Sequence, residues 1–461
     1  MSVRTAIVTF VIAGLSGMSA QNCNQSGTST CTPADLQACI NNPSNTFCRL
    51  GPPGVVYSVG AGQTYQPITV SRGNLTLSGY GVYMVLYQTS PRQPLINVNF
   101  ASNPGITITG FNLWNTGYPN TFGDGPLIRI ERADNGAWPA SPFSNQGPYS
   151  VEMYNNSLAW GQGGSYVESM GILVANASPN RVANLYIHNN YFDHSTVGFF
   201  TNGDEAYSSY PACDTAGYPD SQASYQVRNA RIEGNHFYNT GQGALVVGMA
   251  RWIGIRDNTI NNDSGVHNSG TDFGGAMFID SCANRIDIAR NIMTGAPSNS
   301  LTDGLEIYGR NITITGNTIS GFALDGIALH NAADVQIHDN TIRDNNWHLQ
   351  AGGLHIDNNI PGGRQGGNIS LTLNRFGNNS GYSQKYGLRL TDTAGVPIAT
   401  NISIAADNNF NFGSGNAWRA ACYGNGYLPL QGFPQNPQNV NWPYSGTFLP
   451  GGSSFPWEAC R

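Results

Sequence analysis

Residues 311–345 read NITITGNTISGFALDGIALHNAADVQIHDNTIRDN and contain one phrase twice, as ITITGNTI and VQIHDNTI. Each copy alternates apolar and polar residues and then reaches an Asn, a pattern typical of a short β-strand that ends in a turn. The phrase recurs along the chain, and its Asn falls at Asn156, Asn190, Asn235, Asn258, Asn291, Asn317, Asn340 and Asn374. The shortest intervals are 23 residues, as from Asn235 to Asn258, and the longer ones fit insertions between strands. A repeat of this length predicts a solenoid.

A single coil of this kind cannot bury its apolar face, but coils stacked at about 4.8 Å per rung bury it against one another. Stacked Asn side chains can also form a ladder of amide hydrogen bonds. We expect each Asn to turn the chain itself, because Asn tolerates the left-handed conformation. The sequence therefore predicts an all-β protein, a single-stranded right-handed parallel β-helix over residues 51–410, with the hand taken from the rule for parallel crossovers.

The two ends of the chain differ from the repeat. Residues 1–20 have the form of a signal peptide, with Arg4 before the apolar run AIVTFVIAG and a small-residue cleavage site at residues 18–20. Residues 21–50 are predicted to form a disulfide-rich cap whose segment TPADLQACINN makes a short helix over the first coil. Residues 411–461, rich in Gly, Pro and aromatic residues, are predicted to be an irregular tail.

Composition limits the partners of the chain. Only 10% of its residues are charged, the net charge is −6 and Lys385 is the single lysine, so nothing indicates nucleic-acid binding. No apolar run after the signal segment is long enough to span a membrane. Eight cysteines without a CxxC pair favour disulfides over zinc, including a conditional pair of Cys213 with Cys282. We expect a secreted protein, a monomer, whose partner is a polysaccharide.

A second phrase, Gly-apolar-x-apolar-x, recurs in GGAMFID, DGLEIYG, DGIALHN, GGLHIDN and YGLRLTD. The residues between the apolar ones should point outward and stack from rung to rung. Three outward columns are expected: Met277, Glu306, Ala328, His355 and Arg389; then Ile279, Tyr308, His330, Asp357 and Thr391; and, before the Gly, Gly274, Asp303, Asp325, Gly352 and Tyr386.

This face concentrates ionisable residues in a chain that has few of them. Asp303 and Asp325 should lie one rung apart, so that one carboxyl keeps a proton beside the charge of the other, as a glycoside hydrolase requires. The candidate catalytic residues are Asp303, Asp325, Glu306, His355 and His330. The candidate substrate-binding residues are Tyr308, Arg389, Lys385, Trp347 and Asp357; the Arg and Lys would bind a sugar carboxylate, and Trp347 would stack on a sugar or pack on a neighbouring loop.

The repeat, the signal segment and the N-terminal cap resemble the pectin-lyase-like superfamily of right-handed parallel β-helix proteins. That resemblance implies the fold, and an activity among polysaccharide lyases, glycoside hydrolases and uronan epimerases. The order Asp, Asp, His, then Arg with Lys, is loosely similar to polygalacturonase-type hydrolases. Thr302-Asp303-Gly304 matches one of their motifs in part, whereas Leu324-Asp325 has one acid in place of two and the segment at His355 lacks their Gly-His-Gly.

Three other activities stay open on the same residues. A β-eliminating lyase would use Lys385, Arg389, His330 or Tyr308 as its base, with Ca²⁺ held by Asp303, Glu306 and Asp325. A C5-epimerase of a uronan would use similar groups, although the Asp-Pro-His motif of alginate epimerases is missing. A non-catalytic, adhesin-like scaffold that binds a glycan is the third.

Overall fold

The computed structural model describes most of the repeat region and parts of both ends. Described are residues 31–52, 54–59, 67–86, 94–100, 105–115, 126–133, 149–160, 170–174, 182–193, 197–201, 227–240, 243–262, 275–295, 302–345, 352–358, 366–377, 386–391, 400–412, 419–423, 440–441 and 458–459. The predicted signal segment lies outside them. In this part of the chain, no helix is long and apolar enough to cross a membrane.

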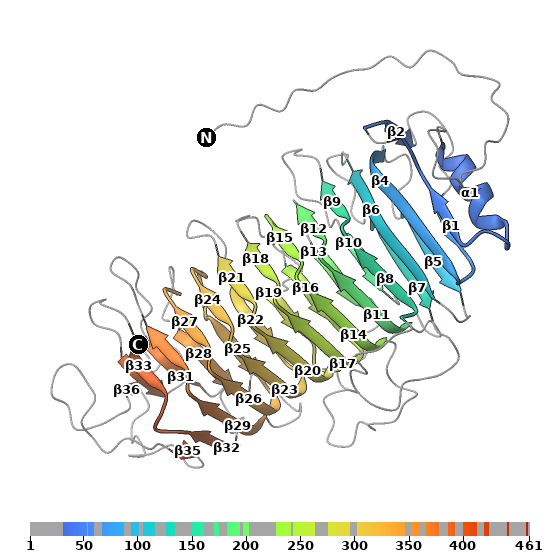
Figure 1. Ribbon diagram of the computed structural model, residues 1–461. Helices are drawn as coiled ribbons and strands as arrows, with labels where there is room; N and C mark the ends of the chain where they lie inside the picture. Colours follow the sequence, from blue (N-terminus) through green and yellow to red (C-terminus); the bar gives the residue numbers. More distant parts are fainter. Residues whose placement is uncertain are drawn as a thin grey trace, which may run out of the picture.

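The chain winds into a long stack of coils in which each strand pairs in parallel with the equivalent strand of the next coil (Figure 1). Each regular coil contributes three strands, so that strands three apart in order, such as β19, β22 and β25, are neighbours. This arrangement is the parallel β-helix, and the predicted fold class is confirmed.

The strands form three parallel faces, named here the first, second and third sheets. The first sheet consists of β3 (Ile68–Val70), β5 (Ile96–Phe100), β7 (Ile128–Ala133), β10 (Met170–Val174), β13 (Val197–Thr201), β16 (Gly243–Val247), β19 (Gly275–Ile279), β22 (Asp303–Ile307), β25 (Ile327–His330), β28 (Gly352–Asp357), β31 (Tyr386–Leu390), β34 (Arg419–Tyr423) and β36 (Glu458–Ala459).

The second sheet follows the first along each coil and carries the repeated phrase. It consists of β1 (Phe47–Arg49), β4 (Leu75–Leu86), β6 (Ile106–Asn115), β8 (Val151–Tyr154), β11 (Val182–His188), β14 (Val227–Glu233), β17 (Ala250–Arg256), β20 (Asn284–Ala289), β23 (Arg310–Thr315), β26 (Ala333–His338), β29 (Gly367–Thr372), β32 (Thr400–Ile404) and β35 (Val440–Asn441).

The third sheet is built from the shorter strands after the Asn of each phrase, and the long strands β4 and β6 run on into it. Its other strands are β2 (Val56–Val59), β9 (Ser157–Trp160), β12 (Tyr191–Asp193), β15 (His236–Tyr238), β18 (Thr259–Asn262), β21 (Ile292–Gly295), β24 (Thr318–Ser320), β27 (Thr341–Arg343), β30 (Arg375–Gly377) and β33 (Asn409–Phe412).

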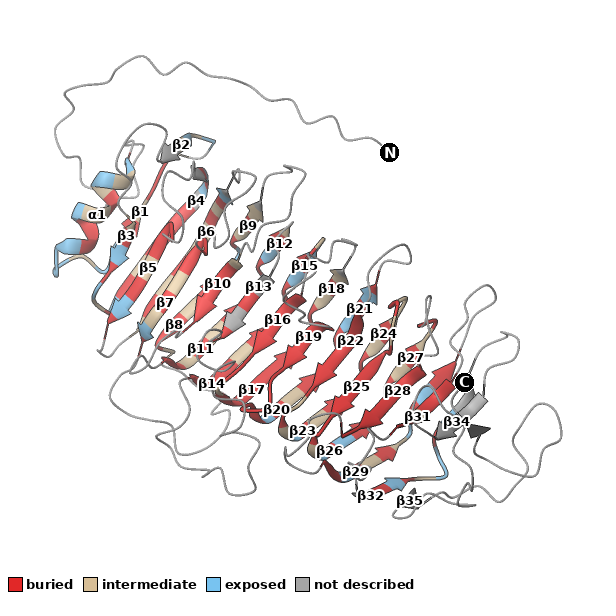
Figure 2. Ribbon diagram, turned by 180° about the vertical axis from the view of Figure 1, so that it is seen from behind, coloured by how far each residue is buried: buried red, intermediate tan, exposed pale blue. Residues whose placement is uncertain are grey.

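Apolar residues at alternate positions of all three sheets fill the interior. In the second sheet Ile286, Ile312 and Val335 stack in register, and each is at most 1% exposed. Figure 2 shows the strands of the first sheet in the middle of the stack, β16 to β28, as almost continuous red. Because β-branched residues fit a pleated sheet that is buried on one face, the Ile- and Val-rich phrase forms strands rather than helices.

The predicted asparagine ladder is present. Asn291 Nδ2 donates to Asn317 Oδ1 at 3.0 Å and Asn317 Nδ2 to Asn340 Oδ1 at 2.9 Å, and the same bond links every rung from Asn156 to Asn374. The ladder continues one rung further, to Asn408, which the sequence pattern missed.

One detail of the turn was predicted wrongly. The left-handed residue is the one before each ladder Asn from Asn156 to Asn374, as at Arg290 (φ 55°), Gly316 (φ 65°) and Asp339 (φ 53°). The ladder Asn itself points inward and is buried. Its amide is needed for the ladder, so the conformational cost of the turn falls on its neighbour.

The two ends of the stack differ. Helix α1 (Pro33–Asn41) forms within the segment TPADLQACINN and covers the first coil, with a Thr32–Asp35 capping box and with Leu36 and Ile40 buried. Cys39 and Cys48 form a disulfide beside it. At the other end β34, β35 and β36 continue the parallel pairing, so the predicted irregular tail contains further rungs that its Gly- and Pro-rich sequence did not indicate.

Candidate active site

The outward face of the first sheet carries the predicted columns, with a one-residue correction at β19. Gly275, not Gly274, pairs with Asp303, and Phe278 pairs with Glu306. Met277 and Ile279 therefore point into the core, where both are fully buried, and Phe278 and Asp280 take their places outside. Because GGAMFID begins with two glycines, the Gly-apolar-x-apolar-x pattern can be aligned to it in two registers, and the prediction took the wrong one. From β22 to β31 the predicted register is correct.

An irregularity at Gly304 brings Asp303 and Glu306 to the same face. Residues three apart on a regular strand point to opposite sides. Here the adjacent amides of Gly304 and Leu305 both donate to the next rung, to the carbonyls of Asp325 and Gly326, as in a β-bulge. A Cβ at Gly304 would lie 2.5 Å from the Gly326 carbonyl oxygen, so only Gly fits this turn.

Asp303 and Asp325 occupy equivalent places on neighbouring rungs. The Asp325 amide donates to Asp303 Oδ1 at 2.7 Å, and the Gly352 amide donates to Asp325 Oδ1 in the same way one rung further on. Both side chains are buried, at 6% and 4% exposure. The two carboxyl groups thus have the same orientation and are offset by one rung.

Two histidines of the site each pair with an aspartate on a neighbouring rung. His355 Nδ1 lies 3.2 Å from Asp325 Oδ2, and its Nε2 lies 2.6 Å from Thr391 Oγ1. His330 Nδ1 lies 2.6 Å from Asp357 Oδ1. The two rings meet edge to face, with centroids 5.7 Å apart. Each imidazole is therefore held by a carboxylate on a neighbouring rung.

Glu306 and Tyr308 complete the cluster on its β22 side. The Tyr308 hydroxyl donates to Glu306 Oε1 at 2.9 Å, and His330 Nε2 lies 3.9 Å from the same oxygen. The Tyr308 ring is 5.0 Å from the His330 ring between centroids. Hydrogen bonds and ring contacts thus fix a cluster that spans β22, the turn before β25, β25 and β28.

The pKa values of the paired aspartates shift in opposite directions. Burial raises the pKa of Asp303 well above its usual value, and the negative charges of Asp325 and Glu306 raise it further. Burial alone would also raise the pKa of Asp325. The charge and hydrogen bond of His355, with Arg389 and the Gly352 amide, outweigh it, so the pKa of Asp325 is lowered. The surroundings of the pair therefore favour a proton on Asp303 and the ionised form of Asp325.

The second acid–histidine pair is held in its charged form. Burial would lower the pKa of His330, but the charge and hydrogen bond of Asp357 raise it above its usual value. Burial would raise the pKa of Asp357, but His330 opposes it and the pKa is lowered. This pair places a positive imidazolium beside Glu306.

The structure brings together eight of the ten candidate residues. The eighth is Arg389, whose Nη1 lies 3.9 Å from Asp325 Oδ2. Lys385 and Trp347 lie outside the described residues. Thr391, the partner of His355, was in a predicted column but was not selected, because a Thr among charged residues carries no signal in sequence.

An apolar cluster on the same outward face was also missed. It consists of Leu173, Val246 and Phe278, with Met170 and Tyr308 packed against it. Leu173 and Val246 lie in β10 and β16, and Tyr308 joins the cluster to Glu306. The candidate site is therefore bordered on its N-terminal side by apolar side chains, a contrast that the wrong register at β19 concealed.

Calcium binding stays a prediction. Within the described ranges, no group of three or more His, Cys, Asp or Glu side chains is placed to hold a metal ion. Asp325 already accepts the Gly352 amide at one oxygen and contacts His355 with the other.

The fold of the chain is a right-handed parallel β-helix, which is the fold that the resemblance to the pectin-lyase-like superfamily implied. Residues 273–417, which contain the whole cluster, match the family model described as the right handed beta helix region. A sequence search among curated proteins gave no significant match.

Several solved structures are similar in fold at low identity. The A-module of the Azotobacter vinelandii mannuronan C-5 epimerase AlgE6 is 14% identical, with 87% of this chain and 97% of that one covered and a TM-score of 0.47. The catalytic domain of a GH87 alpha-1,3-glucanase is 11% identical, with 92% and 70% covered and a TM-score of 0.43. The Streptococcus pneumoniae adhesin PfbA is 12% identical, with 85% and 93% covered and a TM-score of 0.35. Similarity at this level does not assign an activity to the chain.

Proposed function

We propose that the chain is a secreted glycoside hydrolase that cleaves a polysaccharide, with Asp303 as the general acid and Asp325 as the ionised partner. The observation that supports it most directly is the opposite shift of the pKa values of two carboxyl groups on neighbouring rungs. Glycosidic bonds are cleaved by a pair of this kind, one group protonating the leaving oxygen and the other carrying negative charge.

The spacing of the pair favours the double-displacement mechanism. Both carboxyls accept the amide of the equivalent position on the following rung, so their separation is close to one rung, about 4.8 Å. Carboxyl groups about 5–5.5 Å apart are typical of enzymes that retain the anomeric configuration, and a wider gap is needed to admit a water molecule between acid and base.

In the first step Asp303 gives its proton to the glycosidic oxygen while Asp325 attacks the anomeric carbon, which forms a glycosyl ester and releases the leaving sugar. In the second step Asp303 takes a proton from water, the water oxygen attacks the anomeric carbon and Asp325 is released as a carboxylate. Both aspartates end as they began, and one water molecule is consumed.

The neighbouring residues suit an acidic sugar. The guanidinium of Arg389 and the imidazolium of His330 supply positive charge beside the aspartates. A uronic acid unit would place its carboxylate there, which is the substrate class that we propose. The disulfide between Cys39 and Cys48 fits an exported protein.

The test is incubation with a panel of plant and algal polysaccharides, measuring new reducing ends together with absorbance of unsaturated uronate products. Hydrolysis gives the first without the second. Asp303→Asn and Asp325→Asn should each lower the rate by about 100-fold or more, since positioned acid–base groups contribute at least that much. Asp407→Asn makes the same change on an exposed residue and should leave the rate unaltered.

Retention or inversion at the anomeric carbon, followed by proton NMR of the first product, tests the mechanism separately. Release of the inverted product would contradict the spacing argument but leave the acid–base pair intact. Full activity in both aspartate variants would contradict the site.

A β-eliminating lyase is the second candidate, because the Tyr308 hydroxyl and the His330 ring meet at Glu306, where a proton could be moved from a sugar carbon. Its unsaturated product identifies it in the same assay. A C5-epimerase would change the substrate without new ends, and an adhesin-like scaffold would retain a glycan unchanged.

A further inference from the structure

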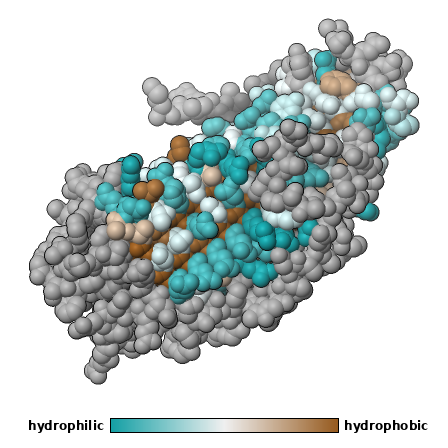
Figure 3. Space-filling view, turned by 60° about the horizontal axis from the view of Figure 1, so that its bottom comes forward, coloured by the Kyte–Doolittle hydropathy of each residue, from teal (hydrophilic) through white to brown (hydrophobic). Residues whose placement is uncertain are grey.

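A groove of about 510 Å³ lies on the second sheet, away from the acid cluster of the first. Its walls come from five successive strands, β17, β20, β23, β26 and β29, so it runs along the axis of the β-helix for about 19 Å over four rung spacings. Figure 3 shows the molecule turned so that the bottom of Figure 1 comes forward, with bands of hydrophilic residues beside rows of hydrophobic ones.

The lining combines polar side chains with the apolar Trp252, Ile286 and Ile312, and its charge is nearly balanced. Thr313, Gln336 and Ser370 stack in one outward column. Asn311 and Asn368 line the edge, where their amides are hydrogen-bonded to neighbouring rungs. Of the charged lining residues, Asp287 is paired with Arg256 outside the groove, and Arg285 and Asp334 offset each other. The groove thus offers hydroxyl and amide groups with little net charge.

Trp252, at one end of the groove, is an unusual residue for its backbone position. On every rung from β11 to β32 the residue at this edge has a positive φ, and on most rungs it is Asn or Asp, as at Asn229, Asn311 and Asp334. Trp252 takes the same conformation with φ 61°, which costs a bulky residue about 1–2 kcal/mol. Its side chain is buried, and its Nε1 has no hydrogen-bond partner among the described residues.

Such a costly residue needs a reason, and strained positions of this kind gather at binding sites. The indole is fixed by two guanidinium groups, those of Arg251 and Arg228, at 4.7 and 5.2 Å from the ring centroid. An Asn would take this left-handed position with less strain, as Asn229 does one rung earlier. The Trp instead closes one end of the groove with a rigid aromatic wall.

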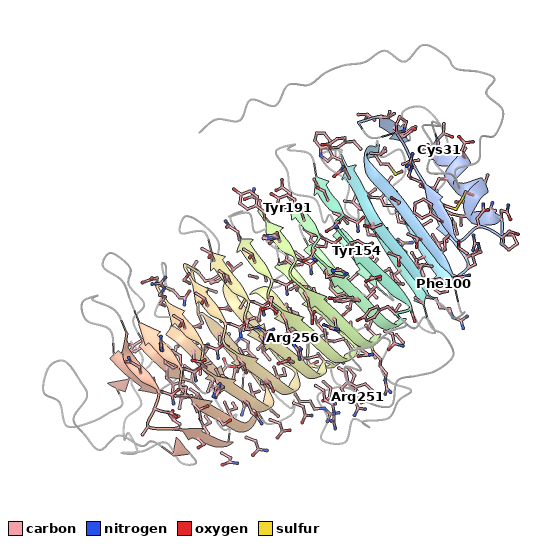
Figure 4. All side chains as sticks on the ribbon, viewed as in Figure 1. Cys31, Phe100, Tyr154, Tyr191, Arg251 and Arg256 are labelled. Atoms are coloured by element: carbon pink, nitrogen blue, oxygen red, sulfur yellow. A yellow bond between two sulfur atoms is a disulfide. The ribbon has the colours of Figure 1, made fainter. Side chains whose placement is uncertain are left out.

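Aromatic residues continue the same sheet face beyond Trp252. Tyr186 and His188 of β11 stack at 4.1 Å between centroids, Tyr154 of β8 lies 5.1 Å from His188, and Tyr149 lies 4.8 Å from Tyr186. By register, Tyr154 and His188 stand in one column with Arg256, and Figure 4 labels Tyr154 and Arg256 along this face. All four rings are partly exposed.

We propose that this face of the second sheet is a second binding site, which holds a segment of a neutral polysaccharide along the helix axis. Hydroxyl and amide side chains match the hydroxyl groups of a sugar chain, and partly exposed aromatic rings match its apolar C–H faces. The long, open groove suits a polymer, and the near-balanced charge suits an uncharged one. The site is separate from the acid cluster and does not depend on the proposed hydrolysis.

The test is affinity electrophoresis of the full chain in gels that contain soluble mixed-linkage β-glucan, glucomannan or amylopectin, with polygalacturonate and alginate as acidic probes. At least one neutral polysaccharide should retard the wild-type protein. Thr313→Trp fills the middle of the groove and should weaken that association at least tenfold. Thr318→Trp, on an outward position of the third sheet, is the matched control and should bind like the wild type.

Trp252→Asn provides a second variant whose side chain suits the left-handed backbone, and thermal unfolding checks that it folds. Gln336→Ala changes only an exposed residue and should weaken binding without affecting folding. Retardation of the wild type by none of the neutral polysaccharides, retardation by the acidic ones alone, or unchanged binding in Thr313→Trp would each overturn the proposal. Loss of binding in Asp303→Asn would place the glycan at the acid cluster instead.

Discussion

At the scale of single residues, the protonation of Asp303 depends on what surrounds Asp325. Asp325 keeps its charge because His355, Arg389 and the Gly352 amide stabilise it, and that charge then helps to keep a proton on Asp303. Burial of both side chains makes these interactions strong, since water does not screen them.

The pH profile of the proposed hydrolysis follows from these shifts. The reaction needs Asp325 ionised, so activity should fall only as the pH drops through its lowered pKa, below the ordinary 3.8. It also needs Asp303 protonated, so activity should fall as the pH rises through its pKa, well above 3.8. Arg389→Gln removes a cation 3.9 Å from Asp325 Oδ2 and should move the acidic limb to higher pH.

Rates measured from pH 2 to 9 for the wild type and Arg389→Gln check this expectation. Arg256→Gln, which removes an arginine paired with Asp287 on the second sheet, is the control and should leave both limbs in place. An acidic limb that does not move in Arg389→Gln would show that Asp325 is not the ionised partner.

At the scale of elements, the asparagine ladder is the feature that sequence predicted best. Each ladder Asn is fully buried and its amide bonds to both neighbouring rungs, so a regular spacing of Asn in the sequence has one physical explanation. The position of the left-handed residue could not be predicted, because the ladder Asn and the Asn, Asp or Gly that precedes it on most rungs all tolerate that conformation. The bulge at Gly304 also left no clear signal, since Gly is frequent throughout the chain.

Asn317→Ala should lower the free energy of unfolding by about 2 kcal/mol or more. It removes the acceptor of the buried Asn291 amide groups and the donor to the Ile288 carbonyl, and each unpaired buried group costs about 1–3 kcal/mol. Urea unfolding followed by circular dichroism measures the change. Thr318→Ala, one residue further on and half-buried, should change it by less than about 0.5 kcal/mol, and equal effects would contradict the ladder's role.

Leu373→Asn should raise stability. Leu373 takes the left-handed position before a ladder Asn with φ 54° and is 46% exposed, so its side chain gains little from burial. Asn155 and Asn189 hold the same position on other rungs. The substitution should add about 1 kcal/mol to the free energy of unfolding, and a lower value in urea unfolding would contradict the conformational explanation.

At the scale of the whole molecule, the fold and the face that carries the site could be predicted from the sequence. In a β-helix, residues one repeat apart in the sequence lie next to each other on successive rungs. Residues just before β25 and those of β28 and β31 become neighbours on successive rungs, which is why Asp325, His355 and Arg389 meet. Contacts within the cluster were not predictable. The pairing of His355 with Asp325, which stand in different predicted columns, depends on side-chain direction, which the repeat does not encode.

A stack of strands also needs closed ends. Leu36→Asp places a charge in the buried face of α1 and should detach the helix from the first coil, which exposes a strand edge and an apolar surface. We expect dimers or larger assemblies in size-exclusion chromatography. Ala38→Asp makes the same change on the exposed face of α1 and should leave the protein's elution unaltered, whereas assembly in both variants would show that the cap is not the cause.

The central claim is that two equivalent aspartates on adjacent rungs hold different protonation states. Carbon-13 NMR titration of the aspartate carboxyl groups measures this directly in the folded chain. The account predicts one carboxyl signal that titrates well above the usual range and disappears in Asp303→Asn, and another that titrates below it and disappears in Asp325→Asn. Two signals that titrate together near the ordinary aspartate pKa, or the reverse assignment, would contradict it.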